Sequence, residues 1–438
     1  MTLPNTLMAT AAIAALTLLA ACGQGPTEAP AAVEEVVDTT DSATETAEDA
    51  SAVVDAMALH DGFVTLDMHL DTPLLLTRPG FDIMARNSVE ADFSQVDVPR
   101  MQEGRLDGGF WVIYTAQGPL TAEAYESAKT SALATAEAIQ AMVADNPDVF
   151  ALATEPEDAA AVAAEGKIIV YQSIENSYPI GEDLSLMQTF YDYGVRMIGP
   201  VHFSNNQFAD SSTDSELLWD GLSPLGEELV REANRLGMIV DASHAHDLAL
   251  DDMLDVSGAP IILSHSGPKG VYDHPRNVDD ARLLRVVEAG GVIGVNAFGG
   301  YLTELEVSEE RNQARRALFA SLQGRSFGDL SAEELAAFNV RRREIDEEFP
   351  PAMADFEDYI EHFLYLLELV GPDHLAVGAD WDGGGGVTGM NDVSAIPRIT
   401  ERLLAEGYTE EDLDKIWSGN AIRLLADVKA YAESLAEE

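Results

Sequence analysis

Short apolar runs alternate with longer amphipathic segments along most of the chain after residue 57. Eight runs have the length and the β-branched and aromatic content of buried strands, and most intervals between them have helical periodicity. The runs are residues 63–69, 108–115, 167–175, 195–202, 237–244, 260–266, 291–298 and 374–382. This alternation predicts an α/β fold, a (β/α)8 TIM-like barrel, with a doubly wound open sheet as the alternative.

One interval is too long for a plain connection between a strand and the next. Residues 303–355, approximately, hold much of the chain's arginine and predict a helical insertion before the last strand. The pattern leaves open a lid, an oligomer contact or a passive excursion. Elsewhere the helix signals are clear: at 223–237, Ser223 is a good N-cap and Pro224 suits the first helical position.

The first apolar run, FVTLDMHLDTPLLL, carries an unusual set of polar side chains. Asp67, His69 and Asp71 recur at every second position, which predicts that all three lie on one face of a strand. Two acids and an imidazole on one buried face are costly unless they bind something. The run therefore indicates a binding site.

Similar polar residues end most of the other predicted strands. The carboxyl ends of barrel strands meet at one face, where barrel active sites lie. The candidates at these ends are His69, Asp71, Glu175, His202, His244, His265 and Asp380, which include four of the nine histidines. Imidazoles and carboxylates without cysteine suit zinc or a related divalent ion. Seven such groups exceed one tetrahedral site and fit two ions that share a bridging carboxylate.

Each candidate also has a simpler structural interpretation. A single histidine at a strand end is more often a structural residue than a ligand, and only the combination of His69, His244 and His265 favours a metal site. Asp67 is better explained as support for a neighbouring ligand or as part of a hydrogen bond in the barrel interior. His246 begins a loop, and His274 is a candidate for the wall of the site. The other three histidines, His60, His362 and His374, are predicted to lie on the surface.

Charge and cysteine content exclude several classes of function. The 438 residues include 77 acidic and 25 basic ones, a formal net charge of −52. Such a surface repels nucleic acid and anionic membranes, so no nucleic-acid partner is expected. Its simplest explanation is a solvated, self-repelling surface. The single cysteine, Cys22, excludes a disulfide framework and a thiolate metal site.

The N-terminal residues have the features of an exported lipoprotein. Residues 1–21 are a short apolar signal segment, too short for a comfortable membrane span, and Leu19 to Cys22 resemble a bacterial lipobox. The first ten residues lack Lys and Arg, so a plain cleaved signal is the alternative. Residues 22–56 comprise the lipidated Cys22 and a predicted disordered acidic tether. We therefore expect a lipid-anchored domain, residues 57–438, in the bacterial cell envelope, facing the periplasm or the exterior.

Taken together, several motifs resemble the membrane (renal) dipeptidase family of zinc peptidases, in a bacterial lipoprotein-type form. The resemblance covers residues 59–425, approximately, and the motifs keep the order and the intervals of the family. The motifs are LDMHLDTP, SIEN, VHFSNNQFADS, GLSPLGEELVREANRLGMIVDASHAH, PIILSHSGPKGVYDHPRNVDD and LAVGADWDG.

The resemblance implies a dipeptidase with two zinc ions in a (β/α)8 barrel. By it, His69 and Asp71 bind one ion, His244 and His265 bind the other, and Glu175 bridges both. A metal-bridging hydroxide attacks the peptide bond of a dipeptide, which in this family tolerates a D-residue on the C-terminal side. The family also suggests a homodimer.

The resemblance further assigns roles to residues around the metals. Asp380 matches the catalytic acid/base, and His202 matches a histidine that contacts the scissile carbonyl or the tetrahedral intermediate. Arg276 matches the arginine that receives the C-terminal carboxylate of the dipeptide, a role that suits a bidentate guanidinium. The structural alternative for Arg276 is an ion pair at the barrel rim.

The chain departs from the family beside the metals. Asn176-Ser177-Tyr178 replaces the Gly-Gly-His run of the animal enzymes, so Tyr178 is a candidate substrate-binding residue. This departure and the insertion leave the substrate open. A related amidohydrolase acting on N-acyl amino acids or lactones is the enzymatic alternative. A non-catalytic peptide-binding lipoprotein is the alternative from another class.

Overall fold

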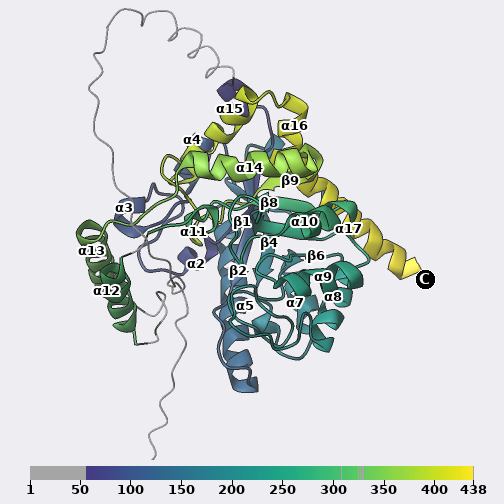
Figure 1. Cartoon of the computed structure of the whole chain (residues 1–438), viewed down its shortest axis with the longest axis horizontal. Coiled ribbons are helices and arrows are strands. Elements are labelled where there is room, and N and C mark those ends of the chain that lie inside the picture. Colours follow the sequence, from purple (N-terminus) through teal and green to yellow (C-terminus); the bar gives the residue numbers. More distant parts are fainter. Residues whose placement is uncertain (1–55, 307, 324, 326, 328–329, 438) are drawn as a thin grey trace, which may run out of the picture.

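The computed structural model describes residues 56–306, 308–323, 325, 327 and 330–437. The predicted signal segment, lipidated Cys22 and most of the acidic tether fall outside these residues. Within the described part of the chain, no helix has the length and apolar character needed to span a membrane. The sequence is folded around one parallel sheet with helices on its outside (Figure 1).

Eight strands close into a parallel barrel, which confirms the predicted fold class. Neighbouring strands follow the order β6-β5-β4-β2-β1-β9-β8-β7, and a parallel bridge between Asp241 and Ile262 joins the two ends of this order. The closing bridge excludes the doubly wound open sheet. The strands are β1 (Leu66–Leu70), β2 (Gly108–Tyr114), β3 (Phe150–Leu152), β4 (Ile168–Glu175), β5 (Val195–Ile198), β6 (Ile239–Val240), β7 (Ile262–Ser266), β8 (Val292–Val295) and β9 (Leu375–Val377).

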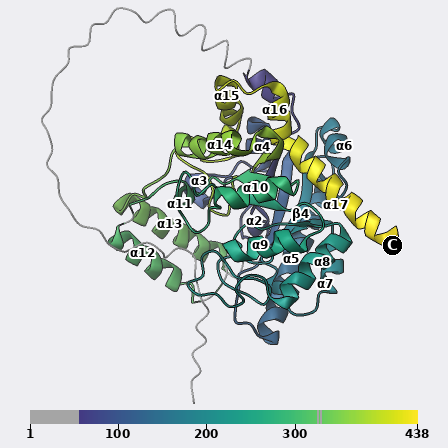
Figure 2. The ribbon, with the colours of Figure 1, turned by 45° about the vertical axis from the view of Figure 1, so that its right-hand side comes forward.

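Helices surround the barrel and extend from its mouth (Figures 1 and 2). The helices are α2 (Pro73–Leu76), α3 (Val89–Asp92), α4 (Val98–Gly104), α5 (Ala122–Asp145), α6 (Asp158–Ala164), α7 (Leu186–Asp192), α8 (Pro224–Leu236), α9 (Asp247–Val256), α10 (Asp280–Glu288), α11 (Gly299–Leu302), α12 (Glu309–Ala320), α13 (Ala332–Glu348), α14 (Phe356–Val370), α15 (Pro397–Ala405), α16 (Glu410–Asp414) and α17 (Asn420–Glu437). Helix α8 begins as predicted, with the Ser223 side chain accepting from the Gly226 amide and Pro224 in the first turn.

One hydrophobic cluster fills the barrel and closes its amino end. It takes at least one side chain from each of the eight barrel strands, among them Phe110, Tyr171 and Met197, and adds Leu424 and Val428 from α17. A separate, larger cluster packs the outer helices on the sheet. Because α17 seals the end where the strands begin, the polar residues at the other end face the open mouth.

The strands are shorter than the predicted runs where those runs carry polar residues. β5 ends at Ile198, β6 at Val240 and β9 at Val377, although the sequence predicts strands through 202, 244 and 382. The polar end residues leave the ladder and turn into the barrel mouth. The sequence also missed β3, a three-residue strand that pairs with β4 outside the barrel order.

The predicted single polar face of the first strand is wrong in detail. Pairing of β1 with β2 shifts register between Asp67 and Leu70, and such an irregularity re-aims the side chains that follow it. Met68 packs in the barrel interior, whereas Leu70 belongs to the outer cluster. Strict alternation therefore fails across this strand, and Asp67 is separated from His69 and Asp71.

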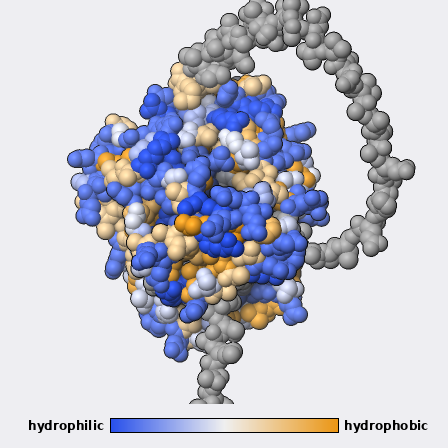
Figure 3. Space-filling view, turned by 90° about the vertical axis from the view of Figure 1, so that its left-hand side faces the viewer, coloured by the Kyte–Doolittle hydropathy of each residue, from blue (hydrophilic) through white to orange (hydrophobic). Residues whose placement is uncertain are grey.

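Residues 303–355 contain α12 and α13, which pack on each other around a small apolar core. Figure 3 views the molecule from the side on which these helices lie in Figure 1. The Arg342 guanidinium lies 3.4 Å from the centre of the Phe93 ring, and the Arg343 Nη1 donates to the Ala91 carbonyl at 2.8 Å. These contacts join the helix pair to α3 and to the residue that ends it.

Two histidines that the sequence placed on the surface, His60 and His362, are fully buried. His60 Nε2 donates to the Gly104 carbonyl at 3.1 Å, and its Nδ1 accepts from the Thr400 hydroxyl at 2.7 Å, whose oxygen accepts from Trp417 Nε1. Helical position alone could not reveal this, because the residues that cover His60 come from helices distant in sequence.

Burial lowers the pKa of His60 from 6.5 to about 4. The unfolded chain therefore takes up a proton at His60 below pH 6.5, while the folded chain does so only near pH 4. The contribution of His60 to the free energy of unfolding is complete above pH 6.5. It falls by about 2 kcal/mol between pH 7 and pH 5. We expect His60→Gln, which can keep both hydrogen bonds, to lose this part of the pH dependence in chemical denaturation. If the free energy of unfolding changed equally with pH in the wild type and in His60→Gln, the attribution of this pH dependence to His60 would be wrong.

Candidate metal centre

The strand ends bring the predicted ligand residues together. His69 lies in β1, Glu175 ends β4 and His265 lies in β7, while Asp71 directly follows β1 and His244 lies in the loop after β6. None of these five residues is more than 5% exposed. Residues separated by as many as 196 positions in the sequence thus share one small, dry volume at the carboxyl end of the barrel.

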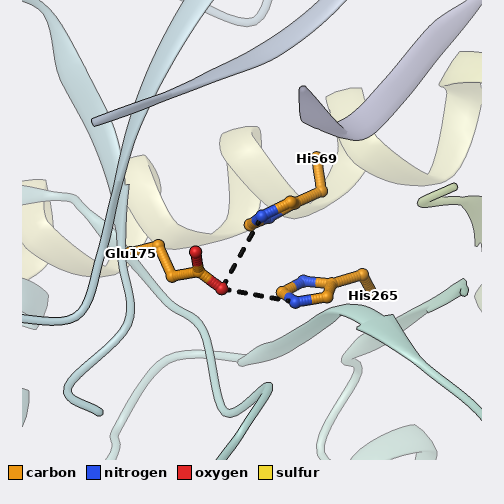
Figure 4. A group of neighbouring side chains, drawn as sticks. All are labelled: His69, Glu175 and His265. Atoms are coloured by element: carbon orange, nitrogen blue, oxygen red, sulfur yellow. Dashed lines mark ion pairs between the residues drawn. The ribbon is translucent and has the colours of Figure 1, made fainter. Parts of the chain in front are cut away.

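The Glu175 carboxylate is the centre of the group. Its Oε1 lies 3.0 Å from His244 Nε2, 3.4 Å from His265 Nε2 and 3.7 Å from His69 Nε2. Figure 4 shows the His69 and His265 rings converging on this oxygen from different strands. Asp71 Oδ2 lies 3.5 Å from His69 Nε2. One carboxylate oxygen thus faces three imidazole nitrogens.

The donor set fits divalent cations. Within the described chain, His69 Nε2, Asp71 Oδ1 and Glu175 Oε1 are buried without a hydrogen-bond partner, which is costly unless another group satisfies them. Three overlapping groups of close ligand atoms occur here: His69 with Glu175 and His265, Glu175 with His202 and His244, and His69 with Asp71 and Asp380. Nitrogen and oxygen ligands in this number suit zinc-type ions.

Electrostatics keep two imidazoles ready to act as ligands. Burial, followed by the positive charge of Arg276 and neighbouring imidazoles, lowers the pKa of His244 well below its ordinary value. Burial has the same effect on His265, with His69 and Arg276 adding to it. A lowered pKa keeps each ring neutral, and the neutral ring is the form that offers a lone pair to a metal.

A hydrogen-bond chain fixes the His265 ring. His265 Nδ1 lies 2.8 Å from Ser264 Oγ, and this hydroxyl donates to Asp241 Oδ2 at 2.6 Å. The serine therefore accepts from the Nδ1 proton, which leaves the Nε2 lone pair directed at Glu175. Outer partners of this kind orient metal ligands, and the sequence analysis did not single out either residue.

Asp67 supports the site from outside, as predicted. Its carboxylate accepts from the His69 amide at 2.8 Å and from the Ala379 amide at 3.1 Å. It thereby ties the residue before Asp380 to the residue that carries the first imidazole. Burial, opposed by these hydrogen bonds, raises the pKa of Asp67 to about 7.

Asp380 faces the group from the loop after β9. It is 8% exposed and has a left-handed φ of 64°, a conformation that is uncommon for non-glycine residues and often found at functional sites. Burial raises the pKa of Asp380 well above its ordinary value, and the negative charges of Asp71 and Glu175 add to this effect. A carboxyl group with a raised pKa can exchange a proton near neutral pH.

Gly383 explains how the Asp71 and Asp380 carboxylates fit beside the chain. A Cβ at this position would lie 2.0 Å from Asp71 Oδ2 and 2.2 Å from Asp380 Oδ1. The loop is held by Asp382, whose Oδ2 accepts from the Thr72 hydroxyl at 2.8 Å and whose Oδ1 accepts from the Gln95 amide at 2.6 Å. The glycine therefore gives the backbone room to pass directly against both carboxylates.

Arg276 reaches the site from the loop before α10 and is 2% exposed. Its Nη1 donates to Ser266 Oγ at 3.0 Å and its Nη2 donates to the His265 carbonyl at 2.9 Å. No carboxylate of the described residues lies within ion-pair distance of it, so the rim ion pair is not formed. A fixed, buried guanidinium without a counter-ion is suited to receive an anionic group.

His202 and Tyr114 lie together beside the Glu175 carboxylate. His202 Nε2 lies 3.8 Å from Glu175 Oε1, and the His202 ring packs edge-on against the Tyr114 ring, with centroids 4.9 Å apart. Tyr114 was not among the site residues predicted from the sequence. The available signal was its place at the end of the second apolar run, directly beside Glu175 in the β2–β4 register.

Tyr178 lies apart from the ligand group. Its ring packs on Tyr125 and Ala128 of α5, and its hydroxyl donates to the Pro119 carbonyl at 2.7 Å. The structure therefore gives Tyr178 a role in ordering the loop after β4. Likewise, His246 caps the start of α9, and His274 Nδ1 accepts from the Arg276 amide at 3.1 Å.

Comparison with known proteins decides the family. The model of the family described as membrane dipeptidase, peptidase family M19, matches residues 53–438. The chain belongs to this family of metallopeptidases. An uncharacterized dipeptidase of Schizosaccharomyces pombe is 30% identical over 387 residues, which cover 86% of this chain and 83% of that protein. The resemblance seen in the motifs is thereby confirmed, and so is the expectation of a metallodipeptidase.

Solved structures of the membrane dipeptidase family share the architecture. The probable dipeptidase PvdM of Pseudomonas aeruginosa aligns with a TM-score of 0.74 at 29% identity, over 87% of this chain and 99% of that one. A metallopeptidase of Rhodobacter sphaeroides, solved with a phosphinate mimic of the dipeptide L-Ala-D-Ala, aligns with a TM-score of 0.65 at 25% identity. That alignment covers 83% of this chain and 99% of that one.

Proposed function

We propose that this membrane dipeptidase family member holds two zinc ions and hydrolyses the peptide bond of dipeptides. The observation that carries the proposal is the single Glu175 oxygen that faces three imidazole nitrogens at 3.0 to 3.7 Å. His69 and Asp71 would hold one ion and His244 and His265 the other, with Glu175 shared. A pair of such ions supplies an activated water and polarises a carbonyl group.

The residues of the chain would supply binding and proton transfer. The Arg276 guanidinium binds the C-terminal carboxylate of the dipeptide and so places the scissile bond. His202 Nε2 lies on the side where it can donate to the carbonyl oxygen as negative charge develops there. Asp380 takes a proton from the attacking water and returns it to the leaving amine nitrogen.

Arg276 also explains a preference for dipeptides. A longer peptide would place an uncharged amide at the position where a dipeptide has its C-terminal carboxylate. The buried positive charge of Arg276 would then stay unpaired. The relative bound to an L-Ala-D-Ala mimic supports including dipeptides with a D-residue on the C-terminal side among the substrates. Peptides released by cell-wall turnover would suit this preference.

The proposed location is the bacterial cell envelope, with a lipid anchor at Cys22 and the domain facing the periplasm or the exterior. The lipobox-like run and the acidic segment after it support this location. A homodimer remains the expectation from the family.

Replacing Arg276 by Met should separate dipeptide hydrolysis from the amidohydrolase alternative. We expect KM for a dipeptide to rise by about tenfold to a hundredfold, because a charge-assisted bidentate contact is lost. Hydrolysis of the matched dipeptide amide, which has no carboxylate, should change little. Steady-state kinetics on both substrates, with an N-acyl amino acid and a lactone beside them, provide the test.

The outcomes are distinct. Faster turnover of the lactone than of any dipeptide, with no effect of Arg276→Met, would favour the amidohydrolase alternative. Binding of dipeptides without turnover of any substrate would favour the peptide-binding lipoprotein.

A further inference from the structure

A pocket of about 230 Å³ lies at the end of the barrel opposite the candidate metal centre. Its lining includes Arg196, at the beginning of β5, and Gly237, which precedes β6, so it opens where the strands begin. Figure 2 shows α17 crossing this part of the molecule, on the other side from α12 and α13. The proposed mechanism uses no residue of this pocket.

Arg196 gives the pocket a fixed positive charge. Its residue is 8% exposed, and its guanidinium lies 3.9 Å from the centre of the Tyr191 ring. Nε donates to the Thr154 carbonyl at 2.9 Å, and Nη1 donates to the Tyr191 carbonyl at 3.0 Å. These contacts hold the Arg196 guanidinium in place, so little side-chain conformational entropy remains to be lost when a ligand binds.

One nitrogen of Arg196 is left for a ligand. Nη2 has no hydrogen-bond partner among the described residues, and no carboxylate among them lies within 4.0 Å of the guanidinium. Burial lowers the pKa of Arg196, which indicates a charge that is desolvated without full compensation.

The remaining lining is amphiphilic. Leu236, Leu425 and Ala432 provide apolar surface, and the exposed side chains of Glu155 and Glu433 provide negative charge. Lys429 pairs with Glu155 at 2.5 Å and lies 4.0 Å from Glu433. The pocket thus combines a buried guanidinium, an aliphatic wall and two more exposed carboxylates, one of which is already paired with Lys429.

This combination fits a small zwitterion better than a simple anion. The pocket is smaller than the roughly 300 to 1,000 Å³ of typical drug-sized sites. The formal charge of −52 opposes the approach of a free anion, whereas a molecule without net charge is not repelled. A free α-amino acid has the required carboxylate, ammonium and side chain in one compact molecule.

We propose that this pocket binds a free aliphatic α-amino acid, with its carboxylate on Arg196 Nη2 and its side chain against the apolar wall. The ammonium group lies toward the carboxylate of Glu433, because Lys429 already pairs with Glu155 at 2.5 Å. Free amino acids are the product class of the proposed reaction, but this second site does not depend on that reaction. If the proposed function holds, the pocket is a place where product amino acid binds away from the metal centre.

Equilibrium dialysis with labelled L-leucine tests the proposal. The matched probes are 4-methylpentanoate, which lacks the ammonium, and 3-methylbutylamine, which lacks the carboxylate. The variants are Ala432→Phe, which fills the pocket from the α17 surface, and Arg196→Gln, with Arg231→Gln on the exposed face of α8 as the control. Competition by unlabelled dipeptide separates binding at the metal centre from binding here.

We expect a leucine site that dipeptide does not displace and that weakens by about tenfold or more in Ala432→Phe and Arg196→Gln. Arg231→Gln should bind as wild type, and both matched probes should bind at least tenfold more weakly than leucine. Ala432→Phe should keep wild-type dipeptide kinetics, so loss of this site is distinguishable from failure of the proposed function. The proposal is overturned if unchanged leucine binding is found in Ala432→Phe, or if 4-methylpentanoate binds as tightly as leucine.

Discussion

Replacement of Asp380 by Asn is expected to lower kcat for dipeptide hydrolysis by about 10² to 10⁴-fold, the usual contribution of a positioned acid/base group. Asparagine keeps the size of the side chain but cannot take up a proton from the attacking water. KM should change little, because the proposed mechanism assigns the substrate carboxylate to Arg276 and not to Asp380. Steady-state kinetics and metal analysis on the same preparation check the prediction.

Asp382→Asn is the matched control for this experiment. Asp382 lies two residues further along the same loop, and its carboxylate binds Thr72 and Gln95 rather than facing the ligand group. Loss of the Asp382 carboxylate should reduce kcat much less than loss of the Asp380 carboxylate. Turnover of Asp380→Asn at the wild-type rate, with full metal content, would refute the role of Asp380 in proton transfer.

Replacement of Gly383 by Ala should cost nearly as much activity, although the new side chain is a single methyl group. Its Cβ would lie 2.0 Å from Asp71 Oδ2 and 2.2 Å from Asp380 Oδ1, so both carboxylates must move. A displacement of about 1 Å at a reacting group can cost on the order of 10²-fold in rate. We expect a loss of this size in kcat/KM, with circular dichroism unchanged.

Gly407→Ala provides the comparison for Gly383. Gly407 has a positive φ of 95° and open space around it, so alanine there strains only the backbone, far from the metal centre. That variant should lose some thermal stability and keep its activity. If Gly383→Ala retained wild-type kcat/KM, the two carboxylates would not need their observed positions.

The barrel and the grouping of the candidate ligand residues could be predicted from the sequence because each depends on a local pattern. Short apolar runs identified all eight barrel strands, and the polar residues that end these runs included His69, Glu175, His244 and His265. The spatial meeting of these residues follows from strand order alone, since all parallel strands end at the same face. In a barrel, residues at the carboxyl ends of the strands can therefore be predicted to lie close together from the sequence pattern alone.

The parts that the sequence did not reveal depend on contacts between distant segments. The burial of His60 needs Thr400 and Trp417, which come from the far end of the chain. The register shift in β1 depends on its pairing with β2, so alternation within the strand could not disclose it. The orientation of Tyr178 toward α5 depends on packing against Tyr125.

Supporting residues were missed for a related reason. Ser264 and Asp241 act through a hydrogen bond across neighbouring strands, and neither has a side chain that is distinctive in the sequence. Gly383 contributes through the absence of a side chain, within a run of four glycines. Only the distances to Asp71 and Asp380 distinguish it from its neighbours.

The central claim is that the Glu175 group holds metal ions on which dipeptide hydrolysis depends. The most direct measurement follows dipeptide turnover by the purified protein before chelation, after chelation and during titration with zinc. We predict that turnover disappears on chelation and returns to a plateau at about two equivalents of zinc, the number of ions that the paired site would hold. Turnover that persists in metal-free protein, or fully loaded protein that hydrolyses no dipeptide, would contradict the account.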